Sequence, residues 1–211
     1  MKLYYSPLST YSQKALIAFN EKGIAYEPQL VDLFSPEGRA AFDKISPLGK
    51  VPFLEPSDDW SVPESTSIIE YLEDRFPDTP RLIAIGAGDA PRLVRFYDRM
   101  ADLYINEPIA ELLFQKIGFR PKDEAKEARM RKVATLSFEN CDKLLANRTW
   151  LAGDRFSMAD CATIPPLFYA RVALPFDAYP NLSAYWERAQ QRPSYVKVRA
   201  EFEPIWNALM K

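Results

Sequence analysis

Several hydroxyl-bearing residues directly follow the first strand-like run of the chain. Ser9 and Ser12 form a Ser-x-x-Ser motif where a redox fold would place Cys-x-x-Cys, and Thr10 lies between them. Thiol–disulfide exchange is therefore not expected from this loop, because it needs an attacking sulfur. The helical pattern that follows would add backbone N–H groups and a helix dipole that favour an anion. The loop from Ser6 to Ser12 is accordingly a candidate site for an anionic group of a ligand.

The chain contains no histidine, which removes the Ser-His-Asp and Cys-His catalytic sets and the commonest zinc ligand. Chemistry here must run on hydroxyls, carboxylates, Lys or Arg side chains, backbone N–H groups or a reactive group of the substrate. No metal site is predicted. The two cysteines, Cys141 and Cys161, stand alone among helix-like residues and are expected to be buried, reduced thiols.

Two further short stretches could contact the same ligand. The Val51–Pro52 bond directly precedes a strand-like run, and in the cis form it would turn the Val51 backbone toward an extended peptide. Glu64 and Ser65 begin a helical pattern, where the carboxylate could hold an ammonium and the Ser65 hydroxyl and N–H could hold a carboxylate. Taken singly, these features also fit a strand-start proline, a helix N-cap and a loop serine.

The elements that must position these residues alternate between strand-like and helical patterns. Their order predicts a small mixed sheet covered by helices. Pro28 inside the second strand-like run favours a sheet edge, since proline has no N–H to donate. The expected strands cover residues 2–6, 25–33, 50–56 and 58–62, with a turn around Ser57 and Asp58, and the expected helices cover residues 12–23, 36–45 and 64–76.

The pattern changes near residue 80, where Gly and Pro interrupt the sequence without a clear hydrophobic period. Beyond that point every periodic segment reads as a helix. We therefore predict an α/β domain over residues 1–78, a linker over 79–90 and an all-helical domain over 91–211. One helix start is well marked, because Ser157 and Asp160 have the spacing of a capping box.

Length and charge limit the classes of partner. The chain has 211 residues, of which 47% are apolar, enough to bury a sizeable core. Its net charge is −2 and its pI is about 5.4, so neither nucleic acid nor an anionic membrane is an expected partner. The N-terminal residues lack the apolar region of a signal peptide, which predicts a cytoplasmic protein.

Several longer motifs occur together in one order along nearly the whole chain. They are "SPLGKVPFL", "VPESTSIIEYLEDRFP", "FSMADCATIPPLF" and "YPNLSAYWERAQQRPSY". In this order they resemble the cytosolic glutathione transferases of bacterial type. The resemblance implies a thioredoxin-like α/β N-terminal domain followed by an all-α C-terminal domain, in a cytoplasmic homodimer that serves detoxification.

The resemblance also implies glutathione as a cosubstrate and assigns residues to it. The cysteinyl backbone of glutathione would lie against Val51 beside a cis Pro52, and its glycine carboxylate near Lys50. Its γ-glutamyl end would bind Glu64 and Ser65, and these assignments match the ligand in charge.

In serine-type members of this family, the first serine of the loop hydrogen-bonds the glutathione sulfur, and that position here is Ser9. The loop departs from the common "S-P-x-S-R" form, since Thr10 follows Ser9 and Gln13 and Lys14 replace a more basic pair. The sulfur partner therefore stays open: Ser9 comes first, Tyr5 at the end of the first strand second, and Ser12 and Thr10 follow.

A pocket for the second substrate is expected between the domains, partly from the first long helix after the linker. Four residues there could face it, although helical spacing more often indicates a core or dimer-interface role: Tyr97, Met100, Ala101 and Tyr104. No charged cluster indicates a substrate, so a small apolar electrophile is the default expectation.

The leading hypothesis is thus an enzyme that transfers the glutathione thiolate to an electrophile. Two alternatives share the fold. The segments "YSQKALIAFNEKG" and "FSMADC" also resemble stringent-starvation-protein-like members, which bind RNA polymerase without catalysing transfer. The second alternative is a glutathione-dependent isomerase of zeta type. It is less favoured because the chain lacks the "S-S-C" loop usual in that group.

Overall fold

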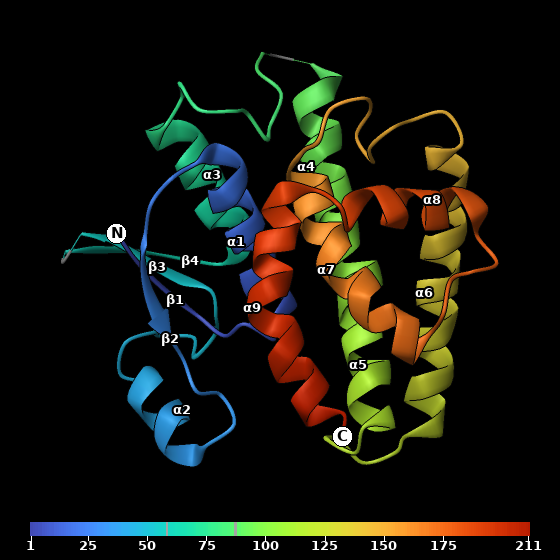
Figure 1. The fold of residues 1–211 in the computed structure, drawn as a ribbon, viewed down its shortest axis with the longest axis horizontal. Helices are drawn as coiled ribbons and strands as arrows, with labels where there is room; N and C mark the ends of the chain where they lie inside the picture. The colour runs from blue at the N-terminus through green and yellow to red at the C-terminus, as the bar shows by residue number, and fades with distance from the viewer. Residues whose placement is uncertain (58, 87) are drawn as a thin grey trace. The chain divides into compact units, whose positions relative to one another are not determined.

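The computed structural model describes residues 1–57, 59–86 and 88–211 (Figure 1). By internal contacts, the chain divides into two compact units: Met1–Leu82 with Pro193–Lys211, and Ile83–Arg192. The first division falls inside the predicted linker 79–90. The second division, after Arg192, groups Pro193–Lys211 with the first unit, whereas the sequence analysis predicts a helical domain over 91–211. The domain boundaries derived from sequence, which include the undescribed Ala87, stay a prediction.

A mixed four-stranded sheet forms the centre of the first unit, as predicted. Its strands are β1 (Lys2–Tyr5), β2 (Glu27–Leu30), β3 (Phe53–Ser57) and β4 (Trp60–Pro63), in the order β2-β1-β3-β4. Strand β1 pairs in parallel with β2 and antiparallel with β3, and β3 pairs antiparallel with β4. The edge position of β2 confirms the expectation from Pro28. Asp58, in the predicted turn, lies outside the described residues.

Helices cover both faces of this sheet, and these are α1 (Thr10–Lys22), α2 (Pro36–Phe42) and α3 (Ser65–Arg75). The same unit also contains α9 (Pro193–Leu209). Neighbouring residues of a strand point to opposite faces. Tyr4 accordingly packs against Phe42 of α2, with ring centroids 6.1 Å apart. Tyr5 packs edge-on against Tyr26, whose ring lies 4.9 Å from that of Phe19 on α1. Both α3 and α9 pack against α1.

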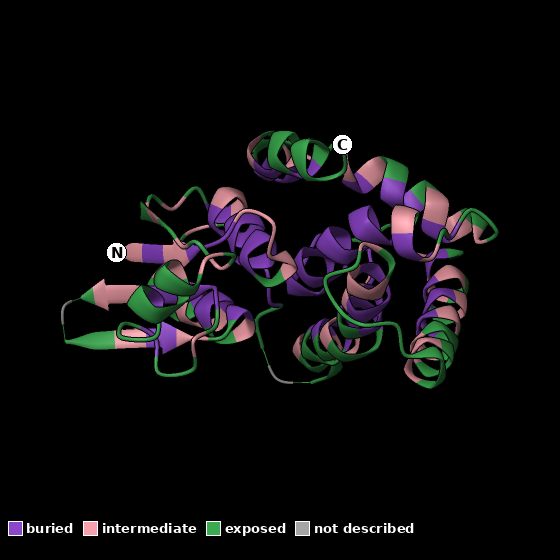
Figure 2. Ribbon diagram, turned by 90° about the horizontal axis from the view of Figure 1, so that it is seen from below, coloured by how far each residue is buried: buried purple, intermediate pink, exposed green. Residues whose placement is uncertain are grey.

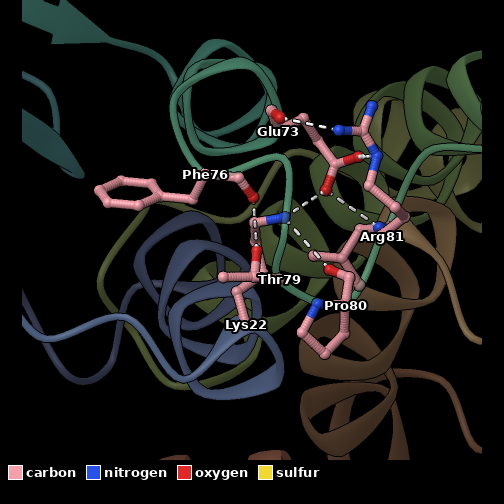
Figure 3. Close-up of polar contacts among 7 residues, drawn as sticks. Lys22, Glu73, Phe76, Thr79, Pro80 and Arg81 are labelled. Carbon is pink, nitrogen blue, oxygen red and sulfur yellow. Dashed lines mark hydrogen bonds and ion pairs between the residues drawn. The ribbon is translucent and has the colours of Figure 1, made fainter.

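A buried ion pair joins the end of α1 to α3 and to the segment that follows (Figure 3). Lys22 Nζ lies 2.7 Å from Glu73 Oε1, with side chains 0% and 3% exposed. Lys22 also donates to the Pro80 carbonyl at 3.1 Å. The Glu73 carboxylate in addition accepts the Leu82 N–H at 3.0 Å and pairs with Arg81 Nε at 3.0 Å. One carboxylate therefore fixes three parts of the first unit.

The second unit is helical in its described residues, which confirms the predicted all-α part of the fold. Its elements are α4 (Asp89–Ala101), the π-helix η1 (Asp102–Asn106), α5 (Glu107–Lys116), α6 (Glu124–Leu145), α7 (Met158–Ala173) and α8 (Pro180–Ala189). Helix α7 packs against α4 and α5 and is buried along nearly all its length (Figure 2).

The predicted capping box at the start of α7 is present, because the Ser157 N–H donates to Asp160 Oδ2 at 2.9 Å. Asp160 also accepts the Leu151 N–H at 3.0 Å and the Tyr185 hydroxyl at 3.1 Å. Burial raises the pKa of this carboxyl to about 6, against the opposing effect of its hydrogen bonds. Asp160 thus ties the preceding turn and α8 to the first turn of α7.

The expectation for the two cysteines is confirmed. Cys141 and Cys161 are both buried and neither forms a disulfide, as predicted. Among the described residues, no helix combines the length and the apolar character that crossing a membrane requires.

Candidate functional site

Strand pairing brings the three predicted stretches to one end of the sheet. Tyr4 pairs with Phe53, and Phe53 pairs with Pro63. The loop after β1, the residues before β3 and the residues after β4 therefore lie side by side. These are the loop from Ser6 to Ser9, the Val51–Pro52 dipeptide, and Glu64 with Ser65.

Hydrogen bonds hold the loop between β1 and α1 in one conformation. The Ser9 N–H donates to the Ser6 carbonyl at 3.0 Å, and the Ser6 N–H donates to Ser12 Oγ at 3.3 Å. The Gln13 side chain donates to the Pro7 carbonyl at 2.8 Å. The first turn of α1 thus anchors the loop that precedes it.

Ser9 is the N-cap of α1, and its Oγ accepts the Ser12 N–H at 3.3 Å. This bond uses a lone pair of the hydroxyl and leaves its proton available. Within the described part of the chain, that proton has no acceptor. Ser9 is half-buried, and the first turn of α1 carries no acidic residue that would oppose an anion there.

The other candidate hydroxyls are differently placed. Ser12 is fully buried and its oxygen accepts the Ser6 N–H, whereas Thr10 is half-buried. Tyr5 is 4% exposed and donates its hydroxyl to Glu201 Oε1 at 2.6 Å. Burial, and then the hydrogen bond and negative charge of Glu201, raise the pKa of Tyr5 well above its ordinary value. These contacts favour Ser9 among the four.

The second stretch enters the sheet through a cis peptide bond between Val51 and Pro52. Val51 packs with Phe42 and Phe53 in an apolar cluster, while Lys50 is exposed. Gly49, just before, has φ +56°, and a Cβ there would lie 2.5 Å from Asp43 Oδ1. A glycine is therefore required at the turn that leads into this stretch.

The third stretch is strained at its first residue. Glu64, the N-cap of α3, has φ 69° and ψ 128°, and among the described residues it is the one non-glycine at positive φ. Such strain costs about 1–3 kcal/mol and clusters at binding sites. Glu64 is exposed and forms no side-chain cap, whereas Ser65 is 4% exposed. Glu64 is thus accessible to a ligand.

A buried cation links the two helix starts. Lys14 on α1 is 1% exposed, and its Nζ lies 2.8 Å from Thr66 Oγ1 in the first turn of α3. Sequence reasoning treated Lys14 and Gln13 only as departures from a family pattern, and it missed Gly49 and Glu201. The "LGK" turn was a usable signal for Gly49. Glu201 had none, because its contact with Tyr5 spans 196 residues.

The predicted second-substrate residues lie on α4 and η1 of the second unit. Tyr97 is 6% exposed and its hydroxyl accepts a hydrogen bond from Arg148 Nη1 at 3.2 Å. Ala101 is fully buried, Met100 is half-buried and Tyr104 is 51% exposed. Their role in binding a substrate stays a prediction. The described residues contain no group of three His, Cys, Asp or Glu side chains suited to a metal ion.

Comparisons with known proteins agree with this geometry. Residues 3–80 match the N-terminal domain of glutathione S-transferases, and residues 104–193 match the C-terminal domain. The Arabidopsis thaliana chloroplastic glutathione S-transferase DHAR3 is 28% identical over 204 residues, 92% of this chain and 70% of that protein. Glutathione S-transferase 2 of Saccharomyces cerevisiae is 29% identical over 213 residues, 94% and 89% of the two chains.

A solved structure, that of glutathione transferase F7 from Populus trichocarpa, superimposes with a TM-score of 0.82. It is 27% identical and covers 94% of this chain and 97% of its own. The thioredoxin-like fold of the first unit and the helical second unit are thus those of its relatives. The chain belongs to the glutathione S-transferase family and is a glutathione transferase that uses glutathione as its cosubstrate.

Proposed function

We propose that the enzyme conjugates the glutathione thiolate to a small apolar electrophile, with the Ser9 hydroxyl donating a hydrogen bond to the sulfur. One observation carries the choice of Ser9. Its hydroxyl proton has no acceptor among the described residues, and it lies at the N-terminus of α1. Tyr5 is already committed as a donor to Glu201.

The required shift in the thiol pKa is modest. A free thiol titrates near 8.5, so only a few per cent is ionised at neutral pH. One hydrogen bond and the helix dipole together could lower that pKa by about two units, which corresponds to about 2.7 kcal/mol. The thiolate then dominates near pH 7 without any histidine. Its sulfur forms a bond to the electrophilic carbon, the leaving group departs with the bonding electrons, and the thiol proton goes to solvent.

The three stretches at the end of the sheet supply the contacts for the tripeptide. The Val51 backbone beside Pro52 would pair with the cysteinyl residue of glutathione. Exposed Glu64 would hold the ammonium, and the Ser65 N–H and hydroxyl would hold the γ-glutamyl carboxylate. Lys50 is exposed and would bind the glycine carboxylate. Each ligand charge then meets an opposite charge or a donor.

The electrophile, the oligomer and the compartment are further parts of the proposal. Tyr97, Met100, Ala101 and Tyr104 would line the electrophile site, with Met100 and Tyr104 supported by their partial exposure. A homodimer follows from the family, and light scattering of the purified protein tests it. The two cysteines, which form no disulfide, support a reducing cytoplasm.

The test is binding followed by titration of the bound sulfur. The protein should be retained on immobilised glutathione and should conjugate a chlorodinitrobenzene. Ultraviolet thiolate absorbance of bound glutathione should give a lowered thiol pKa in the wild type, which Ser9→Ala raises toward 8.5. Retention with an unchanged pKa in Ser9→Ala would refute the role of Ser9 and make Tyr5→Phe the next variant. Failure to bind millimolar glutathione would favour the stringent-starvation-protein-like binding function.

A further inference from the structure

We propose that Glu201 of α9 is a positioning residue for the glutathione-activating loop and acts through Tyr5. The inference rests on the proposed function of that loop. It concerns a residue outside both stretches that match the family models, 3–80 and 104–193.

The contact itself is short and directional. Tyr5 donates its hydroxyl to Glu201 Oε1 at 2.6 Å, within the range of a hydrogen bond to an ionised acceptor. Tyr5 is 4% exposed, and its ring is held edge-on by Tyr26 at 6.3 Å between centroids. The Glu201 carboxylate therefore fixes the last residue of β1 in a closely packed environment.

From Tyr5 the constraint continues into the loop. Ser6 follows Tyr5 directly, and its N–H and carbonyl bond Ser12 Oγ and the Ser9 N–H. The Ser12 N–H in turn donates to Ser9 Oγ. A shift of Tyr5 would therefore move Ser6. Because the Ser6 backbone is hydrogen-bonded to Ser12 and to Ser9, the orientation of the Ser9 hydroxyl would change with it.

Glu201 is itself anchored to the helix that carries the site. Helix α9 packs along α1, and the Asn20 side chain donates to the Ser194 carbonyl at 3.3 Å. The Ser194 hydroxyl is hydrogen-bonded to Glu21. Because α1 holds both the loop and the helix that presents Glu201, the carboxylate is in a fixed position relative to Ser9.

The contact has a second consequence for the chemistry. A phenol whose proton is donated to Glu201 cannot donate that proton to a sulfur. Glu201 thereby leaves the sulfur to Ser9, which agrees with the raised pKa of Tyr5 that burial and this hydrogen bond produce.

Five variants, including the single change Tyr5→Phe, separate positioning from stability. Glu201→Leu removes the carboxylate acceptor of the buried Tyr5 hydroxyl, which destabilises the fold even though the Tyr26 hydroxyl stays beside it. Tyr5→Phe/Glu201→Leu removes both groups and should restore thermal stability. Glu201→Gln keeps a neutral acceptor and tests rescue. The matched control is Glu203→Gln on the same helix, which removes the negative charge 2.8 Å from Arg199 Nε and leaves Tyr5 untouched.

We expect kcat/KM for glutathione to fall about five- to tenfold in Glu201→Leu, Tyr5→Phe and the double variant alike, since small displacements of catalytic groups cost this much or more. KM for the electrophile should change by less than about twofold, and Glu201→Gln and Glu203→Gln should stay near wild type. Hydrogen exchange of the Ser6 and Ser9 amides should accelerate in the three variants that lose the contact.

Several results would overturn the inference. Recovery of activity together with stability in the double variant would show a purely structural contact. Additive losses, no losses, or equal losses in Glu201→Gln and Glu201→Leu would each contradict action through this hydrogen bond. A much larger loss in Tyr5→Phe than in Glu201→Leu would place Tyr5 itself on the sulfur. If the wild type lacks glutathione activity, the proposed function fails, and the exchange rates alone then decide whether Glu201 positions the loop.

Discussion

Replacing Glu73 by leucine should lower the free energy of unfolding of the first unit by much more than the loss of an exposed ion pair would. The change leaves the Lys22 ammonium, which is 0% exposed, without its carboxylate 2.7 Å away. Breaking a buried pair by removing one partner typically costs about 3–5 kcal/mol, because the remaining charge stays buried. The Leu82 N–H also loses its acceptor. Urea unfolding of Glu73→Leu should therefore show a loss of about 4 kcal/mol.

The double variant Lys22→Met/Glu73→Leu separates the cost of burying an unpaired ammonium from the cost of the lost contacts. It buries no charge, so at least about 2 kcal/mol of the loss should return. Glu203→Gln is the control, since its partly exposed pair with Arg199 should contribute less than about 1 kcal/mol. Equal stability of the single and double variants would refute the reasoning, because the uncompensated ammonium would then carry no cost.

Three further outcomes follow from individual residues. Glu64→Gly should stabilise the protein by about 1 kcal/mol, because it relieves the positive φ of 69°, yet weaken glutathione binding in calorimetry. Gly49→Ala should lower stability by about 1–2 kcal/mol, and Asp43→Ala, which removes the clashing carboxylate, should restore part of it in thermal unfolding. The pKa of Asp160, raised to about 6, lies above its unfolded value, so the folded state binds this proton more tightly. Relative to Asp160→Asn, wild-type stability should therefore rise by about 2–3 kcal/mol as pH falls from 7 to about 4, and an unchanged difference between the two in urea titrations would contradict this.

The elements that sequence reasoning predicted well are those with local causes. Gly23 closes α1 at φ 66°, and Pro28 lies on the edge strand β2. The Ser157–Asp160 spacing produced the capping box. In each case, the residue that sets the structure lies within a few positions of the structure it sets. The three candidate stretches were also identified locally, from a proline, two helix starts and their hydroxyls.

What the sequence could not provide were contacts between distant residues. The pattern of α9 predicts a helix, but nothing in it indicates that Pro193–Lys211 would group with the first unit. Tyr5 shows the consequence for the site. From sequence it was the second candidate for the sulfur, and the structure finds its hydroxyl donated to a residue 196 positions away.

The availability of Ser9 follows from how the neighbouring hydroxyls are used. Ser12, which is fully buried, accepts the Ser6 N–H, and Tyr5 donates to Glu201. The Ser12 N–H donates to the Ser9 oxygen and orients it. The hydroxyl proton of Ser9 has no acceptor among the described residues and is available to a ligand. In this loop one serine thus builds the turn, and the other keeps a hydroxyl proton available, which is what the proposed hydrogen bond to the glutathione sulfur requires.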